Sequence, residues 1–268
     1  MRLVQRMALS ILVVVYLAAL LADFIAPAHY SRQFRDTPEA SPSVQFLLGT
    51  DDLGRDRFSR LLYGSRVSLV LAPAAALLST LIAGLVGGVA GFVGRWPERL
   101  AMRGSDLFLS LPWLFLLLTV RALLPLNTEP EVSVAITFAL LGLLGWVTSA
   151  RVVIAGAGAL RASDLVLQAR ATGCYGLRLI TRHVLPNLKP VLLAQFWIAI
   201  PVFILSEANL GVLGLGVAEP LPSWGGLLRE LEHLTGVFAQ PWRLAPVGLL
   251  VLVVSCFHIV FSQDEVAA

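Results

Sequence analysis

Six apolar runs dominate this sequence, and each approaches the length that a helix needs to cross a lipid bilayer. About 20 mostly apolar residues span the hydrocarbon core as an α-helix. In lipid, only helices and closed barrels satisfy every backbone hydrogen bond. The runs cover approximately residues 7–26, 67–94, 106–126, 132–150, 189–212 and 244–262. The sequence therefore predicts an all-α polytopic membrane protein with six transmembrane helices.

Composition supports this fold class and argues against others. Hydrophobic residues make up 57% of the chain, charged residues make up only 14%, and the mean hydropathy is +0.81. Such values are typical of a membrane protein rather than a soluble domain. No Lys/Arg run is interleaved with aromatic residues, so we expect no nucleic-acid partner. The 2 cysteines and 4 histidines are scattered, which predicts neither a disulfide nor a metal site.

Basic residues predict the orientation of the runs, because Lys and Arg collect in cytoplasmic loops. They precede the first run, separate the second from the third and separate the fourth from the fifth: Arg2, Arg6, Arg95, Arg99, Arg103 and the arginines of 161–190. The remaining loops are acidic or balanced, with Glu129, Glu131, Glu219, Glu230 and Glu232. Six spans with both termini in the cytoplasm satisfy this distribution. A signal peptide is an alternative for the first run, but Ala26-Pro27 is a poor cleavage site, so we interpret the run as a retained span.

Residues 161–190 form the longest polar and basic interruption in the second half of the chain. Ser163 is placed to cap a short helix, with Asp164 in its first turn, and Gly173 is placed to end that helix in the left-handed conformation. A second short helix fits the spacing of three apolar residues: Leu177, Ile180 and Val184. Pro186 should stop it. Two short helices that meet at a glycine favour a docking surface, and a basic loop that only sets topology is the alternative.

The segment 27–66 is the longest external piece, with an irregular first part and a helical second part. Thr50 or Asp51 can cap a helix there. Four apolar side chains then form a stripe: Phe58, Leu61, Leu62 and Val67. The pattern predicts an interfacial amphipathic helix that leads into the second span.

Several residues within the spans also carry predictions. The second run contains two pairs of glycines four residues apart, which allow close helix packing in lipid: Gly84 with Gly88, and Gly87 with Gly91. Pro112 is a possible kink in the third run. Arg121 is expected to reach the outer interface, with a pore-facing role as the alternative. Glu207, near the outer end of the fifth run, is a candidate functional residue because carboxylates are rare there.

One motif lies within the basic interruption. It consists of Ala169, Gly173, Arg178, Arg182-His183 and Leu185-Pro186-Asn187. This pattern resembles the EAA loop of ABC importer permeases, the coupling helix that sits in a groove of the ATPase subunit. Where that family has Glu-Ala-Ala, this chain has Leu167-Gln168-Ala169, so the glutamate is absent.

Two further segments resemble the same family. Residues 48–56 are similar to the Leu-Gly-Thr-Asp-x-x-Gly-Arg-Asp signature of dipeptide, oligopeptide and nickel permeases. Residues 206–228 are similar to a second signature, with Asn209 in place of serine and Val212 in place of phenylalanine. Trp224 belongs to that signature, and an anchor at the outer membrane interface is the alternative. From the three segments, the chain is identified as a member of the dipeptide/oligopeptide/nickel ABC importer family, as an inner-membrane permease subunit.

The resemblance implies a type I ABC importer permease in the bacterial inner membrane that forms a heterodimer with a second, related permease. Two ABC ATPase subunits would bind ATP and Mg²⁺, and a solute-binding protein would deliver the substrate. This chain would bind no cofactor or metal. It has no phosphate-binding loop, so it would be a transport subunit and not an enzyme.

The resemblance also assigns candidate residues. The ATPase-coupling residues would be Ala169, Arg170, Gly173, Arg178, Arg182, His183, Pro186 and Asn187. The first signature contributes residues of unknown role: Gly49, Asp51, Gly54, Arg55 and Asp56. Glu207 and Asn209 are candidates for the translocation path.

The expected organisation has three parts: an N-terminal span with a periplasmic segment (1–66), a permease core that contains the coupling loop (67–262), and a cytoplasmic tail (263–268). The substrate stays open among dipeptides, oligopeptides, nickel complexes and other small solutes. A stand-alone secondary transporter or channel would need intramembrane charges or inverted repeats. An intramembrane enzyme would need a nucleophile and base at membrane depth. Neither pattern is evident, so the permease interpretation is preferred.

Overall fold

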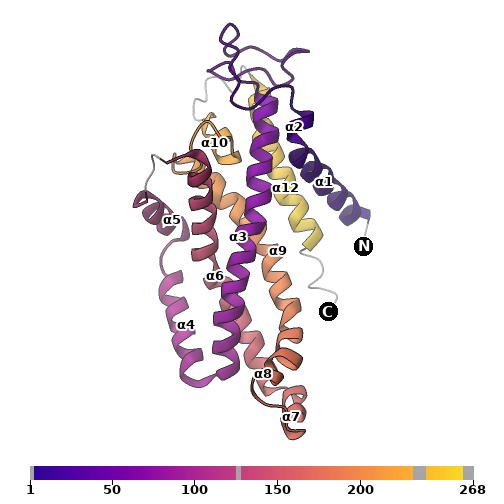
Figure 1. The fold of residues 1–268 in the computed structure, drawn as a ribbon, viewed down its shortest axis with the longest axis vertical. Coiled ribbons are helices and arrows are strands. Elements are labelled where there is room, and N and C mark those ends of the chain that lie inside the picture. Colours follow the sequence, from indigo (N-terminus) through magenta and orange to yellow (C-terminus); the bar gives the residue numbers. More distant parts are fainter. Residues whose placement is uncertain (1–2, 125–127, 232–239, 262–268) are drawn as a thin grey trace. The chain divides into compact units, whose positions relative to one another are not determined.

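The computed structural model describes residues 3–124, 128–231 and 240–261, and these are almost entirely helical (Figure 1). The helices are α1 (Leu3–Leu20), α2 (Ala22–Ile25), α3 (Arg57–Val93), α4 (Arg95–Leu109), α5 (Trp113–Ala122), α6 (Pro130–Ala162), α7 (Asp164–Ala171), α8 (Gly176–Leu179), a π-helical turn η1 (Ile180–Val184), α9 (Leu185–Val212), α10 (Trp224–Arg229), η2 (Pro241–Leu244) and α12 (Ala245–Phe261). Arg2, Glu232 and the predicted tail 263–268 lie outside the described residues.

The predicted all-α polytopic fold is confirmed. Five helical stretches are long and apolar enough to cross a membrane: Leu3–Leu20, Arg57–Val93, Pro130–Ala162, Ile180–Val212 and Pro241–Phe261. The pair α4 and α5 passes the same test when taken together and supplies a sixth candidate span. Each of the six predicted runs overlaps one of these stretches.

The third predicted span differs from the structure in shape. One helix over 106–126 was expected, whereas α4 and α5 are separate helices that meet at an angle of 81°. The break lies at Ser110–Pro112, after the last residue of α4 and before the first of α5. Proline disfavours helical backbone in the residue before it, here Leu111. The proline therefore ends one helix instead of kinking a continuous one.

The start of the second span also differs. No separate amphipathic helix precedes it, because α3 runs without a break for 37 residues from Arg57. Thr50 and Asp51 do not cap it. Asp56 does, since its Oδ2 accepts a hydrogen bond from the Ser59 backbone N–H at 2.9 Å. An accepting side chain just before the first turn satisfies a donor that has no partner within the helix.

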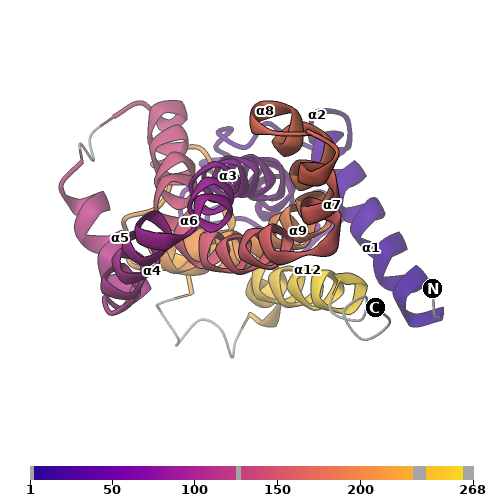
Figure 2. The ribbon, with the colours of Figure 1, turned by 90° about the horizontal axis from the view of Figure 1, so that it is seen from below.

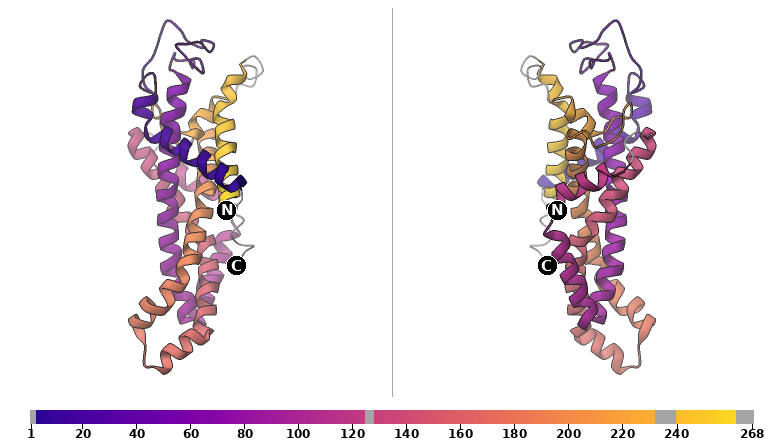
Figure 3. Two further views of the ribbon diagram at one scale, coloured as in Figure 1. Left: turned by 90° about the vertical axis from the view of Figure 1, so that its right-hand side faces the viewer. Right: turned by 90° about the vertical axis from the view of Figure 1, so that its left-hand side faces the viewer.

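The chain forms two compact units. The first comprises Met1–Ala72, Val120–Phe138 and Pro201–Ala268, and the second comprises Pro73–Thr119 and Ala139–Ile200. In the first unit, α1 packs against α12 (Figure 3). In the second, the coupling segment, which we define as residues 161–190, forms two short helices joined by a turn, labelled α7 and α8 in Figure 2.

Glycines bring α3 close to α6 in the second unit. A Cβ atom at Gly87 would lie 2.7 Å from the Ala150 carbonyl oxygen, and one at Gly91 would lie 2.3 Å from that of Ile154. Both distances are too short for a side chain. The predicted close packing is therefore confirmed for this pair of glycines.

Candidate functional site

The first short helix of the coupling segment, α7, begins where the sequence predicted. Ser163 is its N-cap residue, with extended backbone, and Asp164 lies in the first turn, where the helix dipole favours an anion. The Ser163 side chain does not cap the helix, because its Oγ donates to the Leu160 carbonyl oxygen at 2.7 Å instead. The predicted position is confirmed, and the predicted side-chain hydrogen bond is wrong.

The end of α7 depends on Gly173. This residue has a φ of +82°, in the left-handed region that the sequence predicted. The Gly173 N–H donates to the Arg170 carbonyl at 3.0 Å, and the Cys174 N–H donates to the Ala169 carbonyl at 2.9 Å. These two bonds form a Schellman motif, which satisfies carbonyls at the helix end. Gly176, with a φ of +60°, provides a second left-handed residue at the start of α8.

The second short helix does not stop at Pro186, so that prediction is wrong. α8 passes through the π-helical turn η1 into α9, and Pro186 lies near the start of α9. A proline in a helix clashes with the carbonyl of the residue four positions earlier, here Arg182. That carbonyl belongs to the π-helical turn, which is wider than an α-helical turn and leaves room for the proline ring within a continuous helix. Asn187 Nδ2 donates to the His183 carbonyl oxygen at 2.6 Å in the same stretch.

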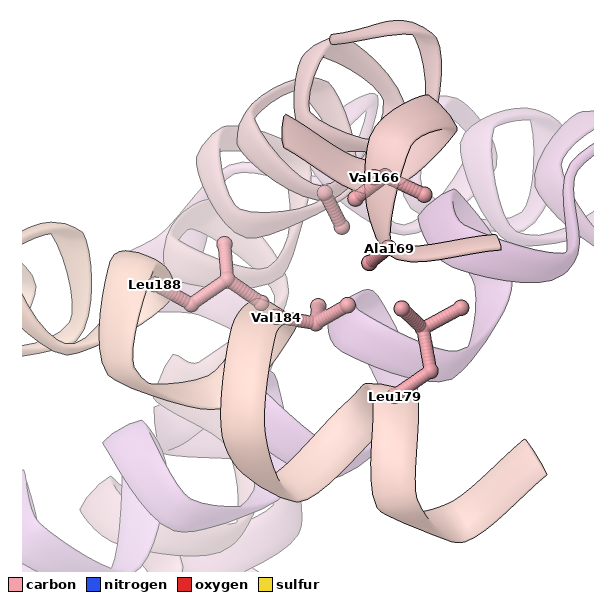
Figure 4. Packing of buried hydrophobic residues seen from close by; sticks show 6 residues of the cluster. Val166, Ala169, Leu179, Val184 and Leu188 are labelled. Atoms are coloured by element: carbon pink, nitrogen blue, oxygen red, sulfur yellow. The ribbon is translucent and has the colours of Figure 1, made fainter. Parts of the chain in front are cut away.

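The short helices are fixed to the longer ones by a small apolar core (Figure 4). In Figure 4, Val166 and Ala169 of α7 point towards Leu179, Val184 and Leu188. Ala157 of α6 completes the cluster, and every member is at least 90% buried. Ala169, one of the predicted coupling residues, therefore packs inside the segment. Arg170 makes a cation–π contact with Phe92, which packs against this core, and its guanidinium lies 5.8 Å from the centre of the ring.

The outer surface of the coupling segment is apolar and basic. Its exposed large apolar residues are Leu165, Leu167, Tyr175, Ile180 and Leu185. Arg178 and Arg182 are also exposed, and neither forms an ion pair with a residue that the structure describes. Of the other predicted coupling residues, Pro186 and Asn187 are exposed and His183 is half-buried. The structure thus gathers these side chains on one compact projection of the second unit.

The first signature forms a tight loop in the first unit. Gly49 and Gly54 have φ values of +71° and +73°. A Cβ atom at Gly49 would lie 2.2 Å from the Ala40 carbonyl oxygen, and one at Gly54 would lie 2.3 Å from that of Phe34. Only glycine fits both the backbone conformation and the space. Both signature glycines therefore hold the loop against the preceding residues 34–40.

The charged residues of this signature join a network with the second signature. We call Asp51, Arg55, Arg57, Arg60, Glu219 and Glu230 the charge cluster. Arg55 lies 2.6 Å from Asp51 and 2.6 Å from Glu219. Arg60, whose side chain is 1% exposed, lies 3.0 Å from Glu219 and 3.1 Å from Glu230. Arg57 pairs with Glu230 at 2.8 Å. The buried guanidinium groups are thus compensated by carboxylates.

These contacts shift the pKa values of the loop residues. Burial by itself would raise the pKa of Glu219, but the charges of Arg60 and Arg55 and their hydrogen bonds outweigh it, so the pKa is lowered. Burial opposes the charge of Arg55 too, yet Glu219 and Asp51 raise its pKa overall. Glu230 differs, because burial raises its pKa more than Arg60 and Arg57 lower it.

Glu207 is enclosed in the first unit and has no exposed surface. Ser68 Oγ donates to Glu207 Oε2 at 3.1 Å and accepts from the Trp224 backbone N–H at 3.2 Å. The Trp224 indole Nε1 donates to Ser65 Oγ at 2.9 Å. Trp224 is also fully buried, so the alternative of an interfacial anchor is wrong. Asn209 is exposed and lies apart from this cluster. A place for Glu207 or Asn209 in the translocation path stays a prediction.

Arg121 was predicted to extend to the outer membrane interface, but it lies inside the protein instead. Its side chain is buried, and Nη2 donates to Ser133 Oγ at 3.0 Å. Ser133 lies in the first turn of α6 and contacts the carbonyl of Gly216, 3.5 Å away. A polar site formed by α6 and a turn therefore holds the guanidinium.

Sequence reasoning missed the partners in these clusters, chiefly Arg60, Glu219, Glu230, Ser65 and Ser68. Each of these residues is more than 130 positions away from its partner in the sequence. A local pattern such as helical spacing cannot identify a pair so far apart. The one available signal was the density of charged residues in and just after the first signature, from Asp51 to Arg60. Among residues 3–124, 128–231 and 240–261, no group of His, Cys, Asp and Glu is arranged to hold a metal ion.

Comparison with known proteins identifies the family. Residues 64–263 match the family described as binding-protein-dependent transport system inner membrane component. The oligopeptide transport system permease protein OppC of Bacillus subtilis is 32% identical over 253 residues, which cover 94% of this chain and 80% of that protein. The dipeptide transport system permease protein DppC of the same organism is 33% identical over 252 residues, covering 94% and 77%. A putative peptide transport system permease protein of Brucella suis is 36% identical over 228 residues, covering 84% and 74%. The chain therefore belongs to the binding-protein-dependent transport system inner membrane components, as a permease subunit of an ABC importer and not an enzyme.

Proposed function

We propose that this permease imports peptides and that its coupling segment is the surface on which an ABC ATPase subunit acts. The peptide substrate is inferred from the names of the relatives, which are oligopeptide, dipeptide and putative peptide permeases. A second, related permease completes the path, two ATPase subunits bind ATP and Mg²⁺, and a solute-binding protein delivers the peptide. The coupling segment and both termini face the cytoplasm.

The observation that carries the coupling role is the apolar core of the segment. To transmit a motion of the ATPase, the coupling segment must move as one rigid body with the membrane-spanning helices α6 and α9. Val166, Leu179 and Val184 are fully or almost fully buried, and each such side chain contributes about 1.5–3 kcal/mol to holding the short helices in place. Displacement of α7 is therefore passed to α6 and α9 instead of being absorbed in a flexible loop.

The contact with the ATPase should depend on apolar and basic side chains. Leu167 occupies the first position of the sequence Leu167-Gln168-Ala169 and is 53% exposed. Exposed Tyr175 lies on the same segment, as do Arg178 and Arg182, which form no ion pair with a described residue. An exposed apolar side chain in a fitted groove supports binding without a carboxylate. The missing glutamate is thus compatible with a working contact.

Gly173 provides a direct test. Apart from its two chain neighbours, no described atom lies within 4 Å of the position of a Cβ there, so a substitution acts through the backbone. Gly173→Leu forces a β-carbon into the left-handed region at a cost of about 1–2 kcal/mol, whereas Gly173→Asn tolerates that region. We expect the leucine variant to insert normally but to lose most ATPase co-purification and peptide uptake, and the asparagine variant to keep both. Normal uptake with Gly173→Leu would contradict the coupling role of this turn.

A further inference from the structure

A polar groove of about 700 Å³ lies in the first unit, beside the charge cluster. Its lining residues come from three parts of the chain: residues 33–57, residues 219–230 and Arg243. The volume is within the range of about 300–1,000 Å³ that is usual for small-ligand sites. Of the described residues, four arginines and four carboxylates line it, and their formal charges cancel.

Six of these eight groups are already paired with one another. Arg55 contacts Glu219 at 2.6 Å, Arg57 contacts Glu230 at 2.8 Å, and Arg243 contacts Glu39 at 2.9 Å. The three arginine side chains are 7%, 12% and 10% exposed. They are therefore held by the protein and are poorly placed to take up a new ligand.

The remaining two groups are Asp52 and Arg229. Both are exposed and line the groove. The side chain of neither residue forms a hydrogen bond or an ion pair with any residue in the described part of the chain. Among the described residues, the groove thus presents one carboxylate and one guanidinium without a charged partner, while its other described charges balance among themselves. Leu53 and Pro220 add apolar surface to the same lining.

We propose that this groove binds a zwitterionic peptide through its free ends. The Asp52 carboxylate would accept hydrogen bonds from the peptide ammonium group, and the Arg229 guanidinium would donate to the peptide carboxylate. Charge-assisted pairs of this kind are the stronger hydrogen bonds in proteins. A zwitterion satisfies both free charges and keeps the lining neutral, whereas a singly charged solute leaves one charge without a partner. This inference rests on the proposed function and names the chemical feature by which the substrate is recognised.

The experiment uses the assembly of two permeases and two ATPase subunits in lipid nanodiscs, without the solute-binding protein, and measures equilibrium binding of labelled trialanine. We expect Asp52→Asn and Arg229→Gln each to weaken binding about tenfold, the effect of losing about 1.4 kcal/mol. Asp36→Asn and Arg35→Gln are matched controls. Both residues are exposed on the same segment and do not line the groove, and their substitution should leave binding unchanged.

Peptides with blocked ends distinguish which residue meets which end. N-acetyl-trialanine has no ammonium group, so its binding should be insensitive to Asp52→Asn and still sensitive to Arg229→Gln. Trialanine amide has no carboxylate, so the pattern should reverse. Equal effects of both variants on all three peptides, or no effect on any, would overturn the proposal.

ATP-driven uptake separates this inference from the proposed function. If the unaltered importer takes up trialanine but the groove variants bind it like the unaltered protein, only the groove assignment fails. If the unaltered importer shows no ATP-dependent uptake of any peptide, the proposed function fails.

Discussion

At the scale of single residues, Glu207 joins three segments that are distant in sequence. Its carboxylate contacts Ser68 of α3, and Ser68 in turn contacts the backbone of Trp224 in α10. A Cβ atom at Gly225 would lie 2.9 Å from Glu207 Oε1, which shows how closely the backbone of α10 approaches. Removing the carboxylate would leave the Ser68 hydroxyl buried without its acceptor.

We therefore predict that Glu207→Leu lowers stability by about 1–3 kcal/mol, the cost of leaving buried polar groups unsatisfied. Glu207→Gln keeps an acceptor oxygen at the same place and should cost much less. Thermal unfolding of the detergent-purified chain, followed by size-exclusion chromatography, measures the difference. If the two variants unfold at the same temperature, the hydrogen bond with Ser68 does not support this site.

At the scale of elements, the glycines of α3 differ in what they contact. Gly91 faces the backbone of α6, whereas a Cβ atom at Gly88 would meet only Leu188 Cδ1 at 3.9 Å, an ordinary contact. We predict that Gly91→Ala destabilises the protein by about 1–3 kcal/mol through overpacking, and that Gly88→Ala is tolerated. The yield of folded protein and its midpoint of thermal unfolding test this pair. Helix propensity favours alanine in both variants, so equal loss in both would mean that the contact with α6 does not determine the effect.

The elements also show how far the sequence could predict the fold. The spans were predictable because about 20 apolar residues in lipid are stable as a helix. The turn at Gly173 was predictable because few residues other than glycine tolerate a left-handed backbone conformation. The break at Pro112 and the continuation of the helix through Pro186 were not predictable from the sequence. A proline can either kink a helix or end it, and the surrounding structure determines which of the two occurs. The partners of Arg55 and Ser68 follow from the path of the chain in space, which no local pattern contains.

At the scale of the whole molecule, the charge cluster constrains how often the chain crosses the membrane. Arg55 precedes α3 and Glu219 follows α9, yet their side chains are 2.6 Å apart. The chain must therefore return to the side of the membrane from which α3 starts. α3, α6 and α9 provide three crossings, which is an odd number. A fourth is required, and only the bent pair α4 and α5 lies between them to provide it.

This argument predicts that Leu123, just after α5, lies on the same side as residues 27–56, and that Tyr175 in the coupling segment lies on the opposite side. Both side chains are exposed, at 81% and 64%. In a variant with serine at Cys174 and Cys256, single cysteines at Asp36, Leu123 and Tyr175 can be labelled in intact cells with a membrane-impermeant maleimide. We expect labelling at positions 36 and 123, and at 175 only after the membrane is opened. Labelling of 175 but not of 123 in intact cells would make the bent pair a re-entrant loop, and would contradict both the crossing count and the cytoplasmic position proposed for the coupling segment.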